Sequence, residues 1–178
     1  MDIKDENLLK SFSKGNEMAA KEFSHRHLGK IYNQAFRLTK NPHDAEEIAQ
    51  EVFIRLWKIA PTWENRGAKI SSWLHRVTYN LCLDKIRSYK IESMPISSEI
   101  ADHSLPAIEL ISHQEQANML LDAIETMPPR QKEAIILKYL EEHSNSEIAY
   151  IMESSIEAVE SLLGRGKKHL TVKLKGRG

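Results

Sequence analysis

Most of the chain places apolar residues three or four positions apart, which is the pattern of helices that bury one side. Four such helices are expected in the first ninety residues, over Asp5–Lys14, Asn16–Leu38, Pro42–Ala60 and Ile70–Lys90. Asn16 and Asn41 stand at the start of two of them, and asparagine caps helix N-termini well. No segment shows the strict alternation of a half-buried strand. The pattern therefore predicts an all-α fold.

The stretch from Ser144 to Leu170 holds two helix starts of the same kind. In each, a serine is followed three positions later by a glutamate: Ser144 by Glu147, and Ser154 by Glu157. Such a capping box satisfies backbone N–H groups that a helix leaves unpaired at its start. We therefore expect a short helix and a long helix joined by a turn, which is helix-turn-helix geometry. The long helix carries its apolar residues on one side, at Ile156, Val159, Leu162, Leu163 and Leu170.

Residues 91–115 interrupt the helical pattern, with two prolines, five acidic residues and no cation. After them an amphipathic helix runs to Met127, Pro128 and Pro129 break it, and a further helix follows from Arg130. Together with the helix-turn-helix, these segments make four helices. We predict two small helical domains, residues 1–90 and 116–178, joined by an acidic flexible linker over residues 91–115.

The formal net charge of zero hides a strong division of charge along the chain. Residues 1–90 carry 16 Lys and Arg against 11 Asp and Glu, whereas residues 91–116 carry five acids and no cation. Positions 165–178 supply six cations and no acid. A cluster of this kind suits phosphates beside a DNA groove. The alternative is a solvated helix end whose cations favour the helix C-terminus, but that alternative does not explain the paired helix caps.

Two further helix faces in the first ninety residues suggest partners. On the helix from Pro42, Ile54 and Trp57 flank an acidic stripe, which favours a protein-docking surface over a merely solvated face. On the helix from Ile70, basic groups alternate with Trp, Tyr and Asn, a composition that suits stacking on and hydrogen bonding to unpaired bases. We interpret Trp73 as a core residue.

Several classes of protein are excluded or disfavoured. Cys82 is the only cysteine, which rules out intrachain disulfides and a thiolate zinc site and makes a packed thiol the expected role. His25 and His27 do not share a helix face, so we expect surface or boundary histidines and no metal site. The sequence has no Gly-rich phosphate loop and no nucleophile-base arrangement, so we expect neither an enzyme nor a cofactor. No apolar run approaches the ~20 residues of a membrane span, so we expect no membrane insertion and a cytoplasmic protein.

Three blocks, taken in order, resemble a bacterial RNA polymerase sigma factor of the extracytoplasmic-function (ECF) group. DAEEIAQEVFIRLW is similar to the family's helix that binds core polymerase, and ISSWLHRVTYNLCLDKIR is similar to its helix that reads the minus-ten element. The segment from Met127 to Leu170 is similar to its domain that reads the minus-thirty-five element. The resemblance implies core RNA polymerase, promoter DNA and an anti-sigma factor as partners, with no catalytic residues, metal or cofactor.

The resemblance also implies a role for particular residues. The expected core-binding residues are Asp44, Glu47, Gln50, Glu51, Ile54 and Arg55. The expected minus-ten residues are Asn65, Arg66, Lys69, Arg76, Asn80, Asp84 and Arg87. The expected minus-thirty-five residues are Glu157, Glu160, Ser161, Arg165, Lys167 and Lys168. The alternative hypothesis is a stand-alone helix-turn-helix DNA-binding transcriptional regulator, which leaves the first ninety residues without a role.

Overall fold

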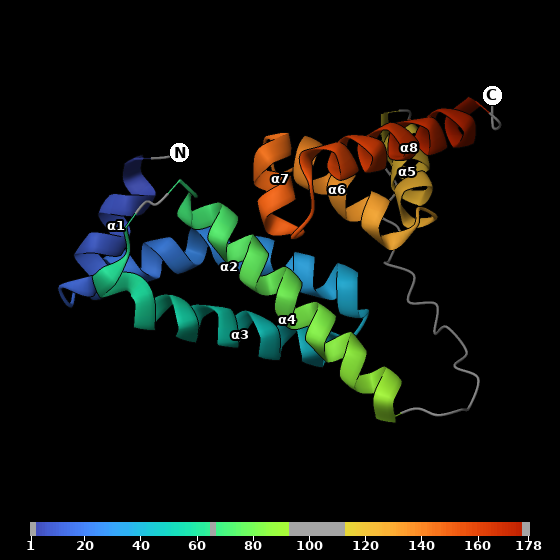
Figure 1. Ribbon diagram of the computed structural model, residues 1–178. Helices are drawn as coiled ribbons and strands as arrows, with labels where there is room; N and C mark the ends of the chain where they lie inside the picture. Colours follow the sequence, from blue (N-terminus) through green and yellow to red (C-terminus); the bar gives the residue numbers. More distant parts are fainter. Residues whose placement is uncertain (1–2, 65–66, 93–112, 176–178) are drawn as a thin grey trace. The chain divides into compact units, whose positions relative to one another are not determined.

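The computed structural model describes residues 3–64, 67–92 and 113–175, and every regular element in these ranges is helical. The elements, shown in Figure 1, are α1 (Ile3–Ser13), α2 (Glu17–Thr39), α3 (Pro42–Ile59), the 3-10 turn η1 (Ala60–Thr62), α4 (Ile70–Glu92), α5 (His113–Glu125), α6 (Pro129–Tyr139), α7 (Asn145–Ile151) and α8 (Ile156–Lys175). They form two units, one with α1 to α4 and one with α5, α6, the beginning of α7 and α8. The prediction of an all-α, two-unit chain is confirmed. Most of the predicted linker, residues 93–112, lies outside the described residues.

Side-chain caps define the long helices of the first unit, as the sequence predicts. Asn16 Oδ1 accepts from the backbone N–H groups of Met18 and Ala19 at 3.1 and 3.2 Å and so starts α2. Asn41 caps α3 in the same way, with Pro42 in the first turn, where a missing N–H costs nothing. At the other end of α2, Lys40 takes a left-handed conformation with φ of 57°, which turns the chain toward α3.

The core of the first unit forms around α2, which contacts α1, α3 and α4. Ile31 on α2, Leu56 on α3 and Leu74 on α4 are almost completely buried. A polar pair lies between α2 and α4: Gln34 Nε2 donates to the His75 carbonyl at 3.3 Å, and His75 Nδ1 lies 2.7 Å from Gln34 Oε1. Because a buried amide without a partner costs free energy, this reciprocal pair favours one register of the two helices.

A cluster of side chains around the buried Asp5 carboxylate attaches α1 to α2. Asp5, with 5% of its surface exposed, lies 2.6 Å from Arg26 Nη1 and 2.9 Å from His27 Nε2. The expectation of a surface or boundary position is wrong for His27, because it is buried against Asp5 of α1 and Phe23 packs against its ring. Burial lowers the pKa of His27, and the nearby Asp5 carboxylate opposes that shift. His27 is therefore held mainly as a neutral donor to Asp5.

In the second unit, α8 packs against α5 and α6. Val159, Leu162 and Leu163 are buried as predicted, and Leu137 of α6 is completely buried. Ile156 is 45% exposed, so its predicted burial is wrong; it is the first residue of α8, where the apolar stripe has not yet reached the other helices. At the far end, His169 Nε2 lies 3.0 Å from Thr126 Oγ1, next to the end of α5.

The two helix starts of the helix-turn-helix differ in how well the sequence predicts them. Ser144 and Glu147 form the expected capping box: the Ser144 N–H donates to Glu147 at 2.7 Å, and the Glu147 N–H donates to Ser144 Oγ at 3.2 Å. The second cap is Ser155, whose Oγ accepts from the Ala158 N–H at 3.1 Å, so the prediction of Ser154 is wrong by one residue. In the turn between them, Glu153 has a φ of 48°.

Candidate functional site

The face of α3 that points away from the core is both apolar and acidic. Ile54 and Trp57 are 41% and 49% exposed, and Glu47 and Gln50 lie on the same side of the helix. The predicted exposure of this face is confirmed. Large apolar side chains that stay exposed beside charged groups are typical of a surface that another protein covers.

Each carboxylate of this face has a partner within the chain. Glu51 Oε1 accepts from Arg55 Nε at 2.7 Å, one helical turn away. Glu47 Oε2 accepts from Lys85 Nζ of α4 at 2.7 Å, and this hydrogen bond raises the pKa of Lys85. Exposed pairs of this kind stabilise a fold weakly. They therefore hold the side chains in place without preventing a docking partner from taking over one of the charges.

Asp44 does not belong to this exposed face, and its predicted exposure is wrong. Its surface is only 2% exposed, and the Tyr89 hydroxyl donates to both carboxylate oxygens at 2.9 Å. Lys85 is a second partner, with Nζ 3.5 Å from Asp44 Oδ1. The last turns of α4 cover the first turn of α3, so Asp44 anchors α4. Its hydrogen bond raises the pKa of Tyr89.

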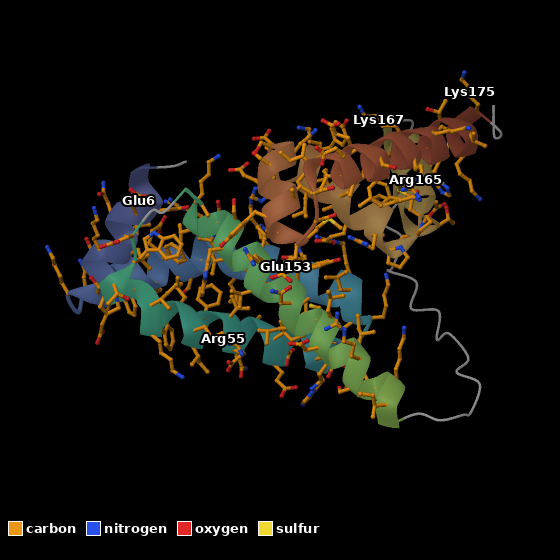
Figure 2. The ribbon with its side chains drawn as sticks, in the orientation of Figure 1. Glu6, Arg55, Glu153, Arg165, Lys167 and Lys175 are labelled. Atoms are coloured by element: carbon orange, nitrogen blue, oxygen red, sulfur yellow. The ribbon has the colours of Figure 1, made fainter. Side chains whose placement is uncertain are left out.

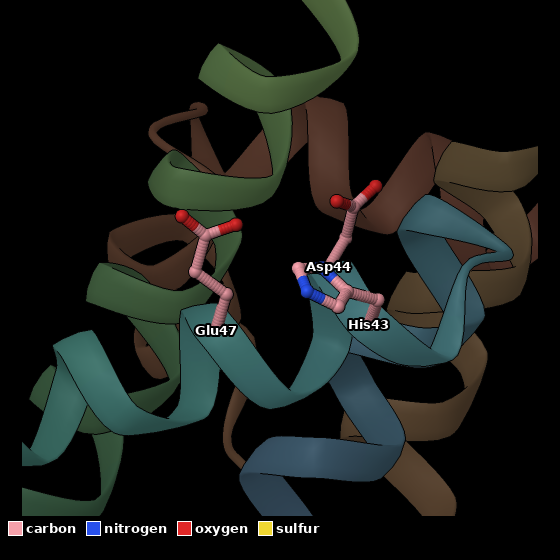
Figure 3. Close-up of side chains that lie close together, drawn as sticks. All are labelled: His43, Asp44 and Glu47. Atoms are coloured by element: carbon pink, nitrogen blue, oxygen red, sulfur yellow. The ribbon is translucent and has the colours of Figure 1, made fainter.

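His43, Asp44 and Glu47 place potential ligand atoms within 4.8 Å of one another at the start of α3 (Figure 3). The Lys85 ammonium, however, already lies beside both carboxylates, and Tyr89 occupies the oxygens of Asp44. A lysine in this position supplies the positive charge that a metal ion would supply. We therefore interpret the group as an ionic contact between α3 and α4.

The predicted minus-ten residues that the structure describes lie on or next to α4. Arg76, Asn80, Asp84 and Arg87 follow at three- and four-residue spacings, so they share one side of the helix. Asp84 and Arg87 are exposed, with Oδ1 and Nη1 3.5 Å apart. Lys69 is half-buried in the residue just before α4.

Two aromatic residues, Trp63 and Trp73, extend the core near the start of α4. Trp73 packs against the core, as expected, with its ring centroid 6.0 Å from that of Trp63.

Two further predicted minus-ten residues, Asn65 and Arg66, lie outside the described part of the chain.

The predicted minus-thirty-five residues are all exposed on α8, and none belongs to the buried stripe that contains Val159 and Leu163. They are Glu157, Glu160, Ser161, Arg165, Lys167 and Lys168. Within this set the acids precede the cations along the helix. The first part of α8 therefore offers carboxylate acceptors, and the second part offers positive charge.

Two of these cations have defined positions. Arg165 turns back along α8, where Nη2 donates to Ser161 Oγ at 2.9 Å and Nε donates to the Ser161 carbonyl at 3.4 Å. The Lys167 ammonium lies 5.6 Å from the ring centroid of Tyr139, which is 50% exposed at the end of α6. Figure 2 shows both side chains on α8. The positive charge is thus partly ordered before any ligand binds.

Sequence reasoning missed three residues that shape these surfaces: Lys85, Tyr89 and Tyr139. Lys85 and Tyr89 lie 38 and 45 residues from their partners on α3. Helical periodicity relates only residues a few positions apart, so it gives no signal for such pairs. For Tyr139 the sequence does hold a signal. It is an aromatic residue beside Leu140, just before the helical pattern breaks, and it does not fit the apolar core stripe of its helix.

Among the described helices, none combines the length and apolar character that crossing a membrane requires.

Comparison with known proteins identifies the family. Residues 23–91 match the family model of Sigma-70 region 2, and residues 117–170 match that of Sigma-70, region 4. The ECF RNA polymerase sigma factor SigW of Bacillus subtilis is 32% identical over 180 residues, covering 94% of this chain and 95% of that protein. The ECF RNA polymerase sigma factor SigE of Mycolicibacterium smegmatis is 31% identical over 153 residues, covering 84% of this chain and 59% of that protein.

Solved structures share the fold at lower identity. The structure of CnrH in complex with the cytosolic domain of CnrY superposes with a TM-score of 0.64 at 20% identity, covering 98% of this chain and 99% of that one. The sigma factor RpoE of Bartonella quintana, solved in complex with the anti-sigma factor NepR, also gives 0.64, at 21% identity over 87% of this chain and 96% of that one. The two family models match the chain in the same order as the two helical units, and the Bacillus subtilis relative is matched over nearly its whole length. The chain therefore belongs to the ECF group of RNA polymerase sigma factors.

Proposed function

We propose that this sigma factor binds core RNA polymerase through the exposed face of α3. The observation that carries the proposal is the pair of large apolar side chains, Ile54 and Trp57, left 41% and 49% exposed next to Glu47 and Glu51. Apolar anchors surrounded by charge are what a specific protein partner recognises. Gln50 and Arg55 belong to the same surface, whereas Asp44 is left out because it is buried.

In the same proposal, the two units read the two promoter elements. The polar side of α4, with Asn80 and Asp84, holds an unpaired base of the melted minus-ten element, and Asn65, Arg66 and Lys69 contribute from the preceding segment. On α8, Glu160, Ser161 and Arg165 read base edges of the minus-thirty-five element in the major groove, and Lys167 and Lys168 contact phosphates. The polarity of α8, with acids before cations, supports this division of roles.

The remaining parts of the proposal follow from this role. Domains of residues 1–90 and 116–178 are joined by a linker of residues 91–115, in keeping with the matched ranges and with the boundary between the two units. An anti-sigma factor is the regulatory partner, since the similar solved sigma factor of Bartonella quintana is held by one. The protein works in the cytoplasm, where polymerase and promoter meet, and it has no catalytic activity of its own.

Reconstitution with core polymerase tests the proposal. We expect the full chain to co-purify with core polymerase and to direct transcription from promoters that core alone does not use. DNA binding by the free chain, combined with no association with core, would instead identify a stand-alone helix-turn-helix regulator. Replacing Trp57 with Ala should weaken association with core and leave the far-UV circular dichroism unchanged, because this side chain is half exposed.

A further inference from the structure

Two glycines of α8 lie two positions apart, and the fold explains only one of them. A Cβ atom at Gly166 would lie 2.7 Å from Ile135 Cγ1 and 2.9 Å from Met127 Cε, so close helix packing requires a glycine there. At Gly164 a Cβ atom would meet nothing within 4 Å, and the residue is exposed. Its φ also lies outside the left-handed range that favours glycine. Within the described residues, therefore, no contact requires a glycine at position 164.

Gly164 lies in the interior of a 20-residue helix, where glycine is a poor choice. A glycine in this setting lowers helix stability relative to alanine, because it loses more backbone entropy on folding. A glycine that destabilises its own helix and has no packing role can indicate a contact with a ligand, when the residues around it also suit that ligand. Its one distinctive property is that it lets an external group approach the main chain closely.

The surroundings of Gly164 are strongly cationic. Lys167 and Lys168 follow it by one turn, and the Arg165 guanidinium is held beside Ser161, one turn before it. All of these side chains are exposed. Glu160 is the single carboxylate one turn away on the same helix. Bare backbone among three positive groups is suited to an anionic, bulky chain that must come close to the helix.

From this arrangement we infer that the sugar-phosphate backbone of DNA lies directly against the main chain of α8 at Gly164. The inference rests on the proposed role of α8 in DNA binding and adds a contact point to it. Lys167 and Lys168 flank the phosphate, next to the base-reading Arg165, and the missing side chain lets these groups reach the DNA. A methyl group at position 164 would hold the DNA strand away by about 1.5 Å, the length of one carbon-carbon bond, and would lengthen every contact that these cations make.

The test is Gly164→Ala in the full chain, because stability and DNA binding should change in opposite directions. Alanine is the better helix former and meets no neighbour, so the melting temperature followed by far-UV circular dichroism should rise by roughly 2–6 °C. All three tryptophans lie in the first unit, so the transition seen by tryptophan fluorescence should not move. The affinity of the reconstituted holoenzyme for DNA should fall on the order of 10-fold, the size of one lost charge-assisted contact.

The DNA probe is a duplex that the parent holoenzyme selects from a pool randomised over the upstream promoter element. Because a backbone contact carries no sequence information, Gly164→Ala should select the same base preferences as the parent. The slope of binding against salt should fall by less than it does in Lys168→Ala, since no charge is removed. Gly164→Leu should weaken binding further than Gly164→Ala does.

Two other glycines provide matched controls. Gly29 lies inside α2 with open space around it, and the helix residues next to it or one turn away include two permanent cations, Arg26 and Lys30, against three at Gly164, and none of the proposed DNA contacts. Gly29→Ala should therefore raise the melting temperature of the first unit and leave DNA affinity unchanged. Gly166→Ala should lower the melting temperature because of its collision with Ile135 and Met127.

The possible outcomes separate this inference from the function on which it rests. If Lys168→Ala weakens DNA binding and Gly164→Ala does not, the contact at Gly164 is refuted and the role of α8 stands. If neither variant affects DNA binding, the assignment of α8 as a DNA-reading helix fails as well. A changed base preference in Gly164→Ala would refute the phosphate contact, because it would place a base edge at this position.

Discussion

Reversing the charge of Glu47 is the sharpest test of the docking face on α3. The Glu47 side chain is 58% exposed and contacts only Lys85 among the ion pairs of this face, so Glu47→Lys should leave the first unit folded. If a core subunit accepts this carboxylate through one charge-assisted contact, its loss costs about 1.5–3 kcal/mol of binding free energy, or roughly 10- to 150-fold in affinity. The new lysine would also face the cation that binds Glu47, which adds repulsion.

The structure supplies a control for the intrachain effect of this change. In Glu47→Lys, the new ammonium faces Lys85 at a position where the parent has a 2.7 Å ion pair. Adding Lys85→Glu restores an ion pair of reversed polarity and returns the net charge to that of the parent. The double variant should therefore regain the part of the stability that the pair of positions 47 and 85 contributes, but not the contact of Lys85 with Asp44, as read by tryptophan fluorescence during urea unfolding. It should not regain affinity for core polymerase, because the exposed carboxylate has moved from α3 to α4.

Affinity for core polymerase is best measured by competition with labelled parent protein for a limiting amount of core. Parent-like affinity of Glu47→Lys would remove Glu47 from the docking surface. Recovery of affinity in the double variant would show instead that Glu47 acts only through Lys85, by holding α4 against α3. Either result would refute the direct contact that the exposed geometry suggests.

Three further predictions concern DNA reading and pH. Arg165→Ala should relax preference at one or two base pairs of the upstream element, whereas Lys168→Ala should weaken all sequences alike and flatten the salt dependence; identical selection profiles for parent and Arg165→Ala would contradict this. Asn80→Ala should slow promoter melting by the holoenzyme, measured with permanganate footprinting, and parent-like melting would place the base pocket elsewhere. Burial lowers the pKa of His27 in the folded state, so below about pH 6.5 the unfolded chain binds more protons than the folded one. The free energy of unfolding should therefore fall as the pH drops below that value. His27→Gln should flatten this pH dependence in urea unfolding, and an unchanged slope would exclude His27 as its source.

The parts of the fold that the sequence predicts best are those with a local cause. Asn16, Asn41 and Ser144 cap helices through bonds to residues two or three positions away, and the sequence shows both partners. Where two serines are adjacent, as at Ser154 and Ser155, the same rule fits two registers. The glutamate at position 157 favours the first, but α8 begins one residue later and Ser155 forms the cap.

What the sequence does not predict depends on contacts between distant segments. The burial of Asp44 requires Tyr89, 45 residues away, and the burial of His27 requires Asp5, 22 residues away. When each helix is considered alone, Asp44 and His27 lie in its polar stripe. Only the packing of a second helix decides which end of such a stripe is covered.

The proposed interfaces share a physical feature that the buried polar groups of the first unit lack. Around Glu47, Glu51 and Arg165, the charged side chains already pair within the chain, at distances of 2.7–2.9 Å, while remaining exposed. Such pairs contribute little to folding, because water competes for both partners. They do restrict rotamers, so less side-chain entropy remains to be lost when a partner binds. Asp5 shows the opposite case: its carboxylate and His27 are both buried, with the partly exposed Arg26 beside them, so breaking these pairs would leave the Asp5 charge unpaired in the interior. Exposed pairs can therefore be exchanged for contacts with a partner at small cost, whereas buried ones fix the fold, and this agrees with the proposed binding through α3 and α8.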